Sequence, residues 1–338
     1  MKLGRRAVCV RIGAAVLPGA LAPLLGGCSR EPEPTLRIGT NVWIGSEPLY
    51  LARELGHLDP KVVRLVEYPS ASEVLRAFRN GAIDGMAISL DELLGLAADG
   101  MRPRAVLAID ISHGADVVLG RAGMKTMRDL RGRRVAVESG ALGAYVLTRA
   151  LALEGMSTAD LQVVHLDSNE QPRAFIAGEV DGAVSFDPYR SQMLRAGAVQ
   201  LFDSTRIPGE IVDLVAVRDS VLPRQPQAVH ALLAGWFRAI DHLRRDPPDA
   251  ARRMGLRQQT SGAQFLQALQ GLHIPSQEEN LRLLGGPQPQ LAASACRLMA
   301  LMVEAGLLRA AYDVGALFAP QPLAQLAPAD PSGLARGR

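Results

Sequence analysis

Two copies of a short string constrain the fold of this chain more than any other feature. Phe-x-x-Gly-x-x-Asp-Gly occupies residues 78–85 and again residues 175–182, and Ser89-Leu-Asp91 and Ser185-Phe-Asp187 follow the two copies. We interpret the phenylalanine as a contact between a helix and a sheet, and the first glycine as the left-handed end of that helix. The Asp-Gly pair would then turn the chain into a buried strand. The echo is imperfect, because the second serine comes one residue early, but it indicates two related halves.

Short apolar segments alternate with helical segments in both halves. Strands are expected at residues 36–39, 62–66, 85–88 and 105–109, and again at 134–137, 163–166, 183–186 and 200–202. Helices are expected between them at 48–55, 72–78, 92–98, 145–153, 171–177 and 189–196. Two further strands, 116–119 and 213–217, fall where the chain would pass between the halves, and helices follow at 229–244, 263–270 and 291–305. This rhythm predicts an α/β fold with parallel sheets and a helical C-terminal part.

Composition excludes several classes of protein. The 338 residues are 48% hydrophobic with a net charge of +3, which excludes a wholly disordered chain and suits one large or two medium domains. The body has no basic block, so we expect no nucleic-acid partner. The three cysteines and six histidines are scattered, so we expect no metal, no cofactor and no disulfide framework. Cys296 is interpreted as a small buried core residue.

The N-terminus has the pattern of an export signal. Four basic residues in the first eleven precede an apolar stretch, residues 12–27, which is too short and too interrupted by proline to span a bilayer well. Leu25-Gly26-Gly27-Cys28 resembles a bacterial lipobox, whose cysteine is lipidated and becomes the first mature residue. We therefore expect a signal peptide over 1–27, a lipid anchor at Cys28 and a polar tether over 28–34. The alternative is a plain anchor helix with an accidental cysteine. Residues 319–338 are expected to be disordered.

Ligands of open α/β sheets bind outside the carboxyl ends of the strands. The candidate ligand-binding residues lie in the loops at those ends, or at the crossover between the halves: Asn41, Trp43, Ser89, Asp91, Asp116, Glu138, Ser139, Asp187 and Tyr189.

Several of these residues also have a purely structural interpretation. Ser89 and Asp187 suit the start of a helix as N-caps. Ser139 fits either a turn or a helix N-terminus that offers backbone N–H groups to a ligand. Asp116 either caps the crossing strand or points into the cleft. Trp43 and Tyr189 fit either a cleft wall or the core, and the sequence leaves these alternatives open.

Several strings, taken together and in order, are typical of one protein family. They are Trp43-Ile-Gly45-Ser-Glu-Pro48 with Tyr50-Leu-Ala52, the two Gly-x-x-Asp-Gly junctions, Asp129-Leu-Arg-Gly132-Arg-Arg-Val135-Ala-Val137 and Ser185-Phe-Asp187-Pro188-Tyr189. From about residue 35 to 318 the chain resembles periplasmic substrate-binding proteins of ABC transporters, within the nitrate, taurine, alkanesulfonate and thiamine-precursor group.

The resemblance implies a type II periplasmic binding protein fold with a central ligand cleft and a hinge between two lobes. Lobe 1 would comprise residues 35–115 and 215–318, and lobe 2 residues 116–214. It also implies a monomer without enzymatic activity that delivers a small molecule to a permease driven by a cytoplasmic ATPase. With the lipobox, it predicts a membrane-anchored periplasmic lipoprotein of the bacterial cell envelope.

The charge of the candidate loops bears on the ligand. They hold Asp91, Glu92, Asp116, Glu138 and Asp187 and no arginine or lysine. Like charges at about 4 Å repel by several kcal/mol at a partly buried site, so we expect a cationic amine or a pyrimidine-like solute stacked on Trp43. The alternatives are a sulfonate, taurine or nitrate anion, and a sensory protein that presents its ligand. An enzyme on the same fold is a weaker alternative, because the cysteine-rich motif of thiamine-pyrimidine synthases is absent.

Overall fold

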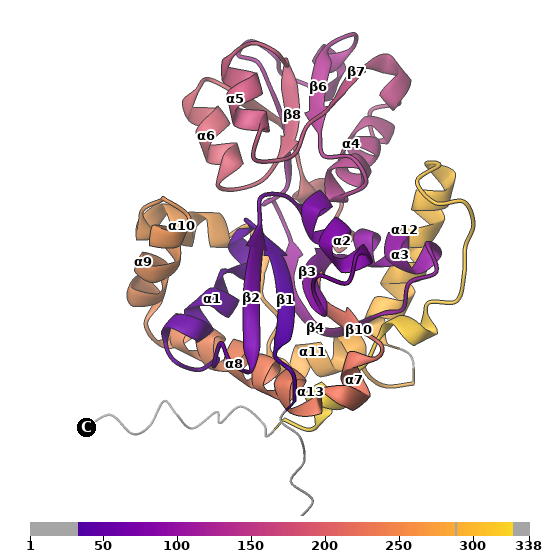
Figure 1. Ribbon diagram of the computed structural model, residues 1–338. Coiled ribbons are helices and arrows are strands. Elements are labelled where there is room, and N and C mark those ends of the chain that lie inside the picture. Colours follow the sequence, from indigo (N-terminus) through magenta and orange to yellow (C-terminus); the bar gives the residue numbers. More distant parts are fainter. Residues whose placement is uncertain (1–32, 288, 327–338) are drawn as a thin grey trace, which may run out of the picture. The chain divides into compact units, whose positions relative to one another are not determined.

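Two sheets form the framework of the protein. The computed structural model describes residues 33–287 and 289–326, and from Glu33 onward the chain forms one compact unit. One sheet has the strand order β11-β4-β10-β3-β1-β2 and the other the order β7-β6-β8-β5-β9 (Figure 1). The predicted α/β class is confirmed, but both sheets are mixed rather than parallel, because each contains antiparallel strand pairs.

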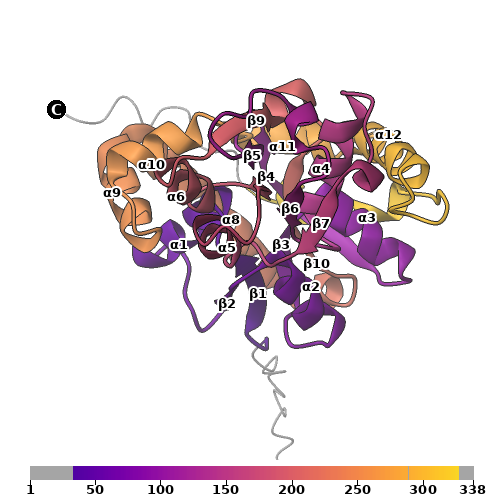
Figure 2. The same cartoon turned by 90° about the horizontal axis from the view of Figure 1, so that it is seen from above.

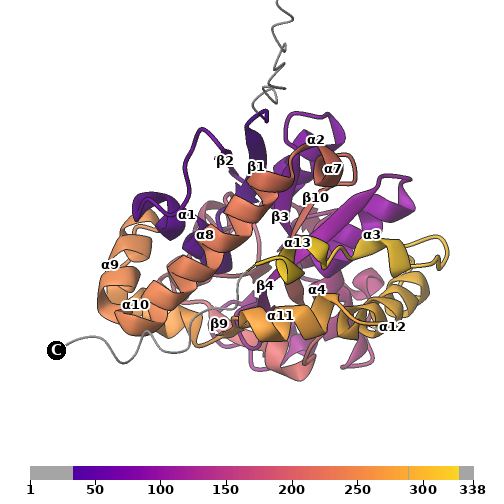
Figure 3. The same cartoon turned by 90° about the horizontal axis from the view of Figure 1, so that it is seen from below.

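Lobe 1 is the part built on the six-stranded sheet. Its strands are β1 (Leu36–Asn41), β2 (Val63–Tyr68), β3 (Gly85–Ser89), β4 (Pro103–Ser112), β10 (Val212–Arg218) and β11 (Leu272–His273). Its helices are α1 (Glu47–Glu54), α2 (Ala71–Arg79), α3 (Leu90–Ala98), α7 (Val221–Arg224), α8 (Pro226–Arg245), α9 (Pro247–Arg257), α10 (Gly262–Leu269), α11 (Gln277–Leu284), α12 (Gln290–Glu304) and α13 (Gln321–Ala324). Figure 3 shows α8 crossing the underside of this lobe, where it contacts α1 and α13.

Lobe 2 is the part built on the five-stranded sheet. Its strands are β5 (Val117–Gly120), β6 (Arg134–Val137), β7 (Gln162–His165), β8 (Gly182–Ser185) and β9 (Val199–Asp203). Helix α4 (Leu142–Ala152) lies on one side of them, and α5 (Gln171–Ile176) and α6 (Tyr189–Arg195) lie on the other (Figures 1 and 2). Each strand expected from the sequence is present, whereas the helices α7, α9, α11 and α13 and the short strand β11 were not predicted.

The two sheets repeat one arrangement of strands. In lobe 1, β1 pairs in parallel with β2 and β3, and β10 runs antiparallel to β3. In lobe 2, β6 pairs in parallel with β7 and β8, and β5 runs antiparallel to β8. The internal echo in the sequence therefore reflects two equivalent β-α-β units, each joined by an antiparallel strand that lies next to a crossover between the lobes.

The repeated aspartate holds an arginine in each lobe. The Asp84 carboxylate accepts hydrogen bonds from the backbone N–H and the Nε of Arg37, at 3.0 and 2.8 Å. Asp181 does the same for Arg134, at 3.1 and 3.2 Å. Each pair joins the turn before one strand, β3 or β8, to the start of the neighbouring parallel strand. The sequence predicted an Asp-Gly turn here but not these charged contacts.

The repeated phenylalanine has a matching partner as well. The guanidinium of Arg218 lies 4.1 Å from the ring centre of Phe78, and that of Arg121 lies 4.2 Å from the ring centre of Phe175. Arg218 is the last residue of β10, and Arg121 directly follows β5. The first glycines of the two strings, at φ of 74° and 77°, end their helices in the left-handed conformation as expected.

The chain passes between the lobes twice, after β4 and before β10. At these crossovers the hydroxyls of Ser112 and Ser204 lie 2.8 Å apart, and the N–H of Gly114 donates to Ser204 Oγ at 2.6 Å. Val212 and Asp213 already pair with β4. Lobe 2 therefore ends before Val212, and the expected boundary at residue 214 is wrong, because β10 begins earlier than its apolar core suggests.

Three further expectations need correction. Residues 319–326 are ordered rather than disordered, because the Ala319 N–H donates to the Ala105 carbonyl at 2.8 Å and Leu323 is fully buried. The end of the tether packs, since Glu33 accepts a hydrogen bond from the Ala228 N–H at 3.2 Å. Cys296 is exposed, because α12 turns other residues, such as Leu298, toward the core.

The predicted signal peptide over 1–27, Cys28, most of the predicted tether and residues 327–338 lie outside the described residues. Within the described part of the chain, no helix is long and apolar enough to cross a membrane.

Neutralising either repeated aspartate should destabilise the protein. Burial raises the pKa of Asp84, but the hydrogen bonds from Arg37 outweigh it and hold the pKa below its usual value. Arg134 likewise lowers the pKa of Asp181. This stability is present above about pH 4 and is lost as the pH falls through the lower folded-state pKa.

Asp84→Asn and Asp181→Asn should each lower the free energy of unfolding by about 1–2 kcal/mol at neutral pH. When the pH falls, each variant should lose less stability than the wild type. Urea unfolding at pH 7 and pH 3 measures this. An equal loss in the exposed-residue control Asp59→Asn would contradict the assignment.

Candidate ligand-binding cavity

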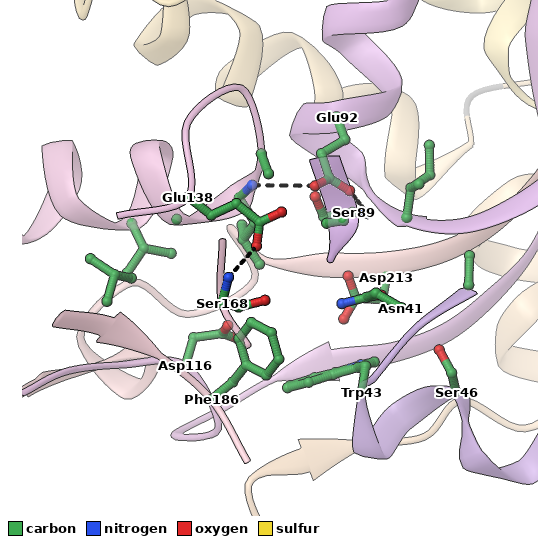
Figure 4. Close-up of a pocket in the computed structure, with 18 of the residues that line it drawn as sticks. Asn41, Trp43, Ser46, Ser89, Glu92, Asp116, Glu138, Ser168, Phe186 and Asp213 are labelled. Carbon is green, nitrogen blue, oxygen red and sulfur yellow. Dashed lines mark hydrogen bonds between the residues drawn. The ribbon is translucent and has the colours of Figure 1, made fainter. Parts of the chain in front are cut away.

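A cavity of about 50 Å³ lies among the loops at the carboxyl ends of the parallel strands of both lobes (Figure 4). A water molecule needs about 10–15 Å³ of such space, so the cavity suits a small solute. The polar and aromatic residues that line it are Asn41, Trp43, Ser46, Ser89, Glu92, Asp116, Glu138, Ser168, Gln171, Phe186 and Asp213. The remaining lining is apolar, from Ala71, Ala87, Ile88, Ile109, Ala141, Leu142, Gly143, Val146 and Val184.

Five of the nine residues predicted to bind a ligand line this cavity: Asn41, Trp43, Ser89, Asp116 and Glu138. They lie at or just after the ends of β1, β3 and β6, or in the crossover directly before β5. Of the two alternatives that the sequence left open for Asp116, a strand cap or a residue that points into the cleft, the cavity lining supports the second. Ser89 lines the cavity and is also the N-cap of α3, where its backbone N–H donates to Glu92 Oε2 at 3.0 Å.

Asp187 and Tyr189 do not line the cavity, although we expected ligand contact from both. The Asp187 carboxylate accepts a hydrogen bond from the Ser191 N–H at 3.1 Å, so it caps the first turn of α6. The Tyr189 ring is buried and packs against Phe186, with ring centres 5.7 Å apart. Both residues therefore have the structural role that the sequence offered as their alternative.

Asp91 and Ser139 do not line it either. The Asp91 carboxylate accepts a hydrogen bond from Ser89 Oγ at 2.6 Å at the start of α3. Ser139 is exposed at the edge of the cleft, and its carbonyl accepts from Ser72 Oγ at 3.3 Å. The loop after β6 therefore presents Glu138 to the cavity and turns the next residue outward.

An aromatic pair forms one wall. The rings of Trp43 and Phe186 meet edge to face with centres 5.2 Å apart, and Trp43 Nε1 donates to Asp110 Oδ2 at 3.1 Å. Gly45 permits this approach, because a Cβ there would lie 1.8 Å from Asp110 Oδ2. Trp43 is both a cavity wall and almost wholly buried, so its two alternatives in the sequence are not exclusive.

Buried carboxyl groups surround the cavity, and none of its described lining residues is arginine, lysine or histidine. Burial, with the negative charge of Asp91, raises the pKa of Asp116 to about 6. Burial and repulsion from Asp91 and Glu138 raise the pKa of Glu92 to about 8. The pKa of Asp213 is raised well above its usual value by burial and by the neighbouring Asp110 and Asp116. This surface favours a positive charge over a negative one.

Polar atoms without a hydrogen-bond partner are buried at the same place. They are Ser46 Oγ, Asp116 Oδ2, Ser168 Oγ and Gln171 Oε1, all on lining residues. Buried polar groups are normally hydrogen-bonded, so these atoms suit contacts with a ligand or with water. Among the described residues, no group of three histidine, cysteine or acidic side chains is arranged to hold a metal ion.

Sequence reasoning missed several lining residues. Ser46, Ser168 and Phe186 follow β1, β7 and β8, so their position after a strand was a usable signal. Asp213 gave no such signal, because it lies near the start of a strand. Since β10 is antiparallel, its start lies opposite the end of β3, and Asp213 pairs with Ser89.

The buried carboxyl groups should make the ligand-free protein less stable as the pH rises. Their folded-state pKa values are raised, so their contribution is present below about pH 4 and is lost as the pH rises through about 6 for Asp116 and about 8 for Glu92. Asp213→Asn should flatten this decline and raise the free energy of unfolding at pH 8, because the variant has no carboxyl group to ionise there. Urea unfolding from pH 5 to pH 8 measures it, with Asp59→Asn as the control. A decline as steep as in the wild type would contradict the assignment.

Comparison with known proteins is consistent with this geometry. The sequence profile of the NMT1-like family matches residues 29–255. Over 197 residues the chain is 29% identical to an Escherichia coli (strain K12) protein named "Putative aliphatic sulfonates-binding protein", a match that covers 55% of this chain and 60% of that protein. The chain thus spans less than two thirds of the length of the curated relatives that it matches.

Solved structures share the fold at lower identity. The periplasmic aliphatic sulphonate binding protein SsuA of Escherichia coli superposes with a TM-score of 0.69 at 22% identity, over 87% of this chain and all of that one. SsuA of Xanthomonas axonopodis pv. citri, bound to MOPS, gives 0.67 at 21%, over 82% and 95%. The desulfurization enzyme DSZB gives 0.63 at 16%, over 86% and 98%. The chain therefore belongs to the NMT1-like family and has the periplasmic binding protein fold that its sequence resembles.

Proposed function

We propose that this protein captures a small cationic or nitrogenous solute, an amine or a pyrimidine-like compound, for an ABC importer. Its family, its fold and the names of its relatives support the role of a solute-binding protein. The observation that carries the ligand class is the set of carboxyl groups on the cavity surface, with no basic side chain among the described lining residues.

A positive charge in this cavity would interact with several acids at once. Asp116, Glu138 and Asp213 all line it, and Asp116 Oδ2 is buried without a hydrogen-bond partner. Burial and neighbouring acids raise the pKa values of Asp116 and Asp213. A cation that binds there would favour the ionised form of both groups, whereas an anion would add to the repulsion between them. The Trp43 and Phe186 rings offer an apolar surface for the rest of the solute.

A sulfonate or a similar anion is the second candidate. The Escherichia coli relative and both SsuA structures are named for sulfonates. The hydroxyls of Ser46 and Ser168, which have no partner in the structure, could donate to an oxyanion. Binding of an anion would require several of the lining acids to be protonated, so it should weaken steeply as the pH rises.

A thermal-shift screen of the protein, refolded once to remove bound solute, separates the two classes. Amines, amidines, ureas and pyrimidines are compared with taurine, alkanesulfonates, nitrate and phosphonates. A ligand at a hundredfold excess over its dissociation constant stabilises by about 2.7 kcal/mol, which gives a readable shift. We expect a cationic compound to give the largest shift, and Asp116→Asn to weaken its binding by about tenfold or more.

Asp59→Asn is the matched control and should bind like the wild type. The solute should be recovered unchanged, because the proposal includes no chemical step. A largest shift from a sulfonate, unaffected by Asp116→Asn, would contradict the charge argument. Transfer of the solute by the partner permease and ATPase would distinguish transport from a sensory role.

We further propose that the protein is a monomer anchored on the periplasmic side of the cell envelope by a lipid at Cys28. The support is the sequence Leu25-Gly26-Gly27-Cys28 after a basic and apolar leader. Cys28→Ser should move the protein from the detergent-extracted membrane fraction to the soluble fraction. Unchanged membrane association in this variant would favour a plain anchor helix instead.

A further inference from the structure

We propose that Glu138 is a built-in anion that joins the two lobes and excludes anionic solutes. Its carboxylate, on lobe 2, occupies the N-terminus of helix α2 on lobe 1, a position that would otherwise suit the negative group of a ligand. The inference rests on the proposed function only in taking this cavity as the ligand site.

The contacts of Glu138 reach both lobes. Oε1 accepts a hydrogen bond from the Ser72 N–H of lobe 1 at 2.7 Å, and Oε2 accepts from the Ser168 N–H of lobe 2 at 3.3 Å. Figure 4 shows the second of these bonds at the edge of the cavity. The Glu138 side chain thus bridges the lobes while its carboxylate faces the ligand space.

Helix α2 leaves the Ser72 N–H without a partner inside its own lobe. Ser70 is the N-cap, and its hydroxyl accepts from the Glu73 N–H at 3.3 Å. The first N–H groups of a helix have no partner within the helix, and they attract negative charge. The carboxylate of the opposite lobe supplies both the acceptor and the charge.

Two further hydrogen bonds join the lobes at the same place. Ser70 Oγ donates to Asp167 Oδ2 at 3.1 Å, and Ser72 Oγ donates to the Ser139 carbonyl at 3.3 Å. Both acceptors belong to lobe 2. The start of α2 is therefore held by the loops after β6 and β7, which also carry the lining residues Glu138 and Ser168.

An unpartnered side chain beside this contact points to a ligand. Ser168 Oγ is buried and has no hydrogen-bond partner, although the Ser168 N–H is bound to Glu138. Gln171 Oε1, which belongs to another lining residue of lobe 2, is likewise buried and unpartnered. A solute that binds here would contact the group that links the lobes, so binding and closure would be coupled.

A second, weaker hydrogen bond joins a carboxylate of lobe 1 to the start of a helix of lobe 2. Glu92 Oε1 of lobe 1 accepts from the Leu142 N–H, at the start of α4 in lobe 2, at 3.3 Å. The bond is longer, and the same carboxyl group also accepts from the Ser89 N–H within lobe 1. Glu138 is therefore the residue to test first.

Glu138→Ala tests the inference by removing the carboxylate and leaving space for a free anion. In the ligand-free protein, we expect a larger radius of gyration by small-angle scattering and stronger acrylamide quenching of Trp43. Trp236, the other tryptophan, is fully buried and should be quenched little. Acetate, added at constant ionic strength, should restore the wild-type values, and acetate and ethanesulfonate should bind about tenfold tighter than to the wild type.

Two variants complete the design. Glu138→Gln keeps the shape but removes the charge, and it should open the lobes less than the alanine variant. Glu304→Ala removes an exposed glutamate and should change neither scattering nor anion affinity. Unchanged scattering in Glu138→Ala, or no gain in acetate affinity, would overturn the inference even if an amine binds. If no cation binds but acetate closes Glu138→Ala, the inference stands and the proposed ligand class fails.

Discussion

In each lobe an aspartate pairs with an arginine where two parallel strands begin, and the rest of the structure depends on this interaction. Asp84 binds Arg37 in lobe 1, and Asp181 binds Arg134 in lobe 2, in each case through backbone and side chain together. Each pair fixes where two parallel strands start relative to one another. Because the strands are short, the carboxyl ends of neighbouring strands also lie at the same edge of the sheet, and the loops that line the cavity meet there.

The cavity has the opposite electrostatic design to these pairs. In the framework each carboxylate has an arginine, and its pKa is lowered. In the cavity the carboxyl groups are buried near one another, and the pKa values of Glu92, Asp116 and Asp213 are raised. Such an arrangement costs folding free energy as the pH rises, and a bound cation would offset that cost. Stability and solute affinity are therefore linked through the same protons.

The sequence was most informative where local chemistry determines structure. The strands and the repeated string were recognisable because apolar periodicity and a helix-ending glycine act over a few residues. Helix α9 was missed because it presents few apolar residues, and it is held by ion pairs such as Arg257 with Glu47. Asp213 and the contact of Glu138 with Ser72 depend on strands and lobes that meet only after folding, so no local pattern indicates them.

Because the framework pairs lie apart from the cavity, one fold would be able to bind ligands of opposite charge. The framework pairs lie at the starts of strands, whereas Glu138 lies in a loop at the far end of β6. A carboxylate in that loop can supply the negative charge at the start of α2 that a bound anion would otherwise supply, without a change in either sheet. Closure then needs no anionic ligand, and the solute can carry the opposite charge. Relatives named for sulfonates and the cation-binding cavity that we propose for this chain are therefore compatible within one family.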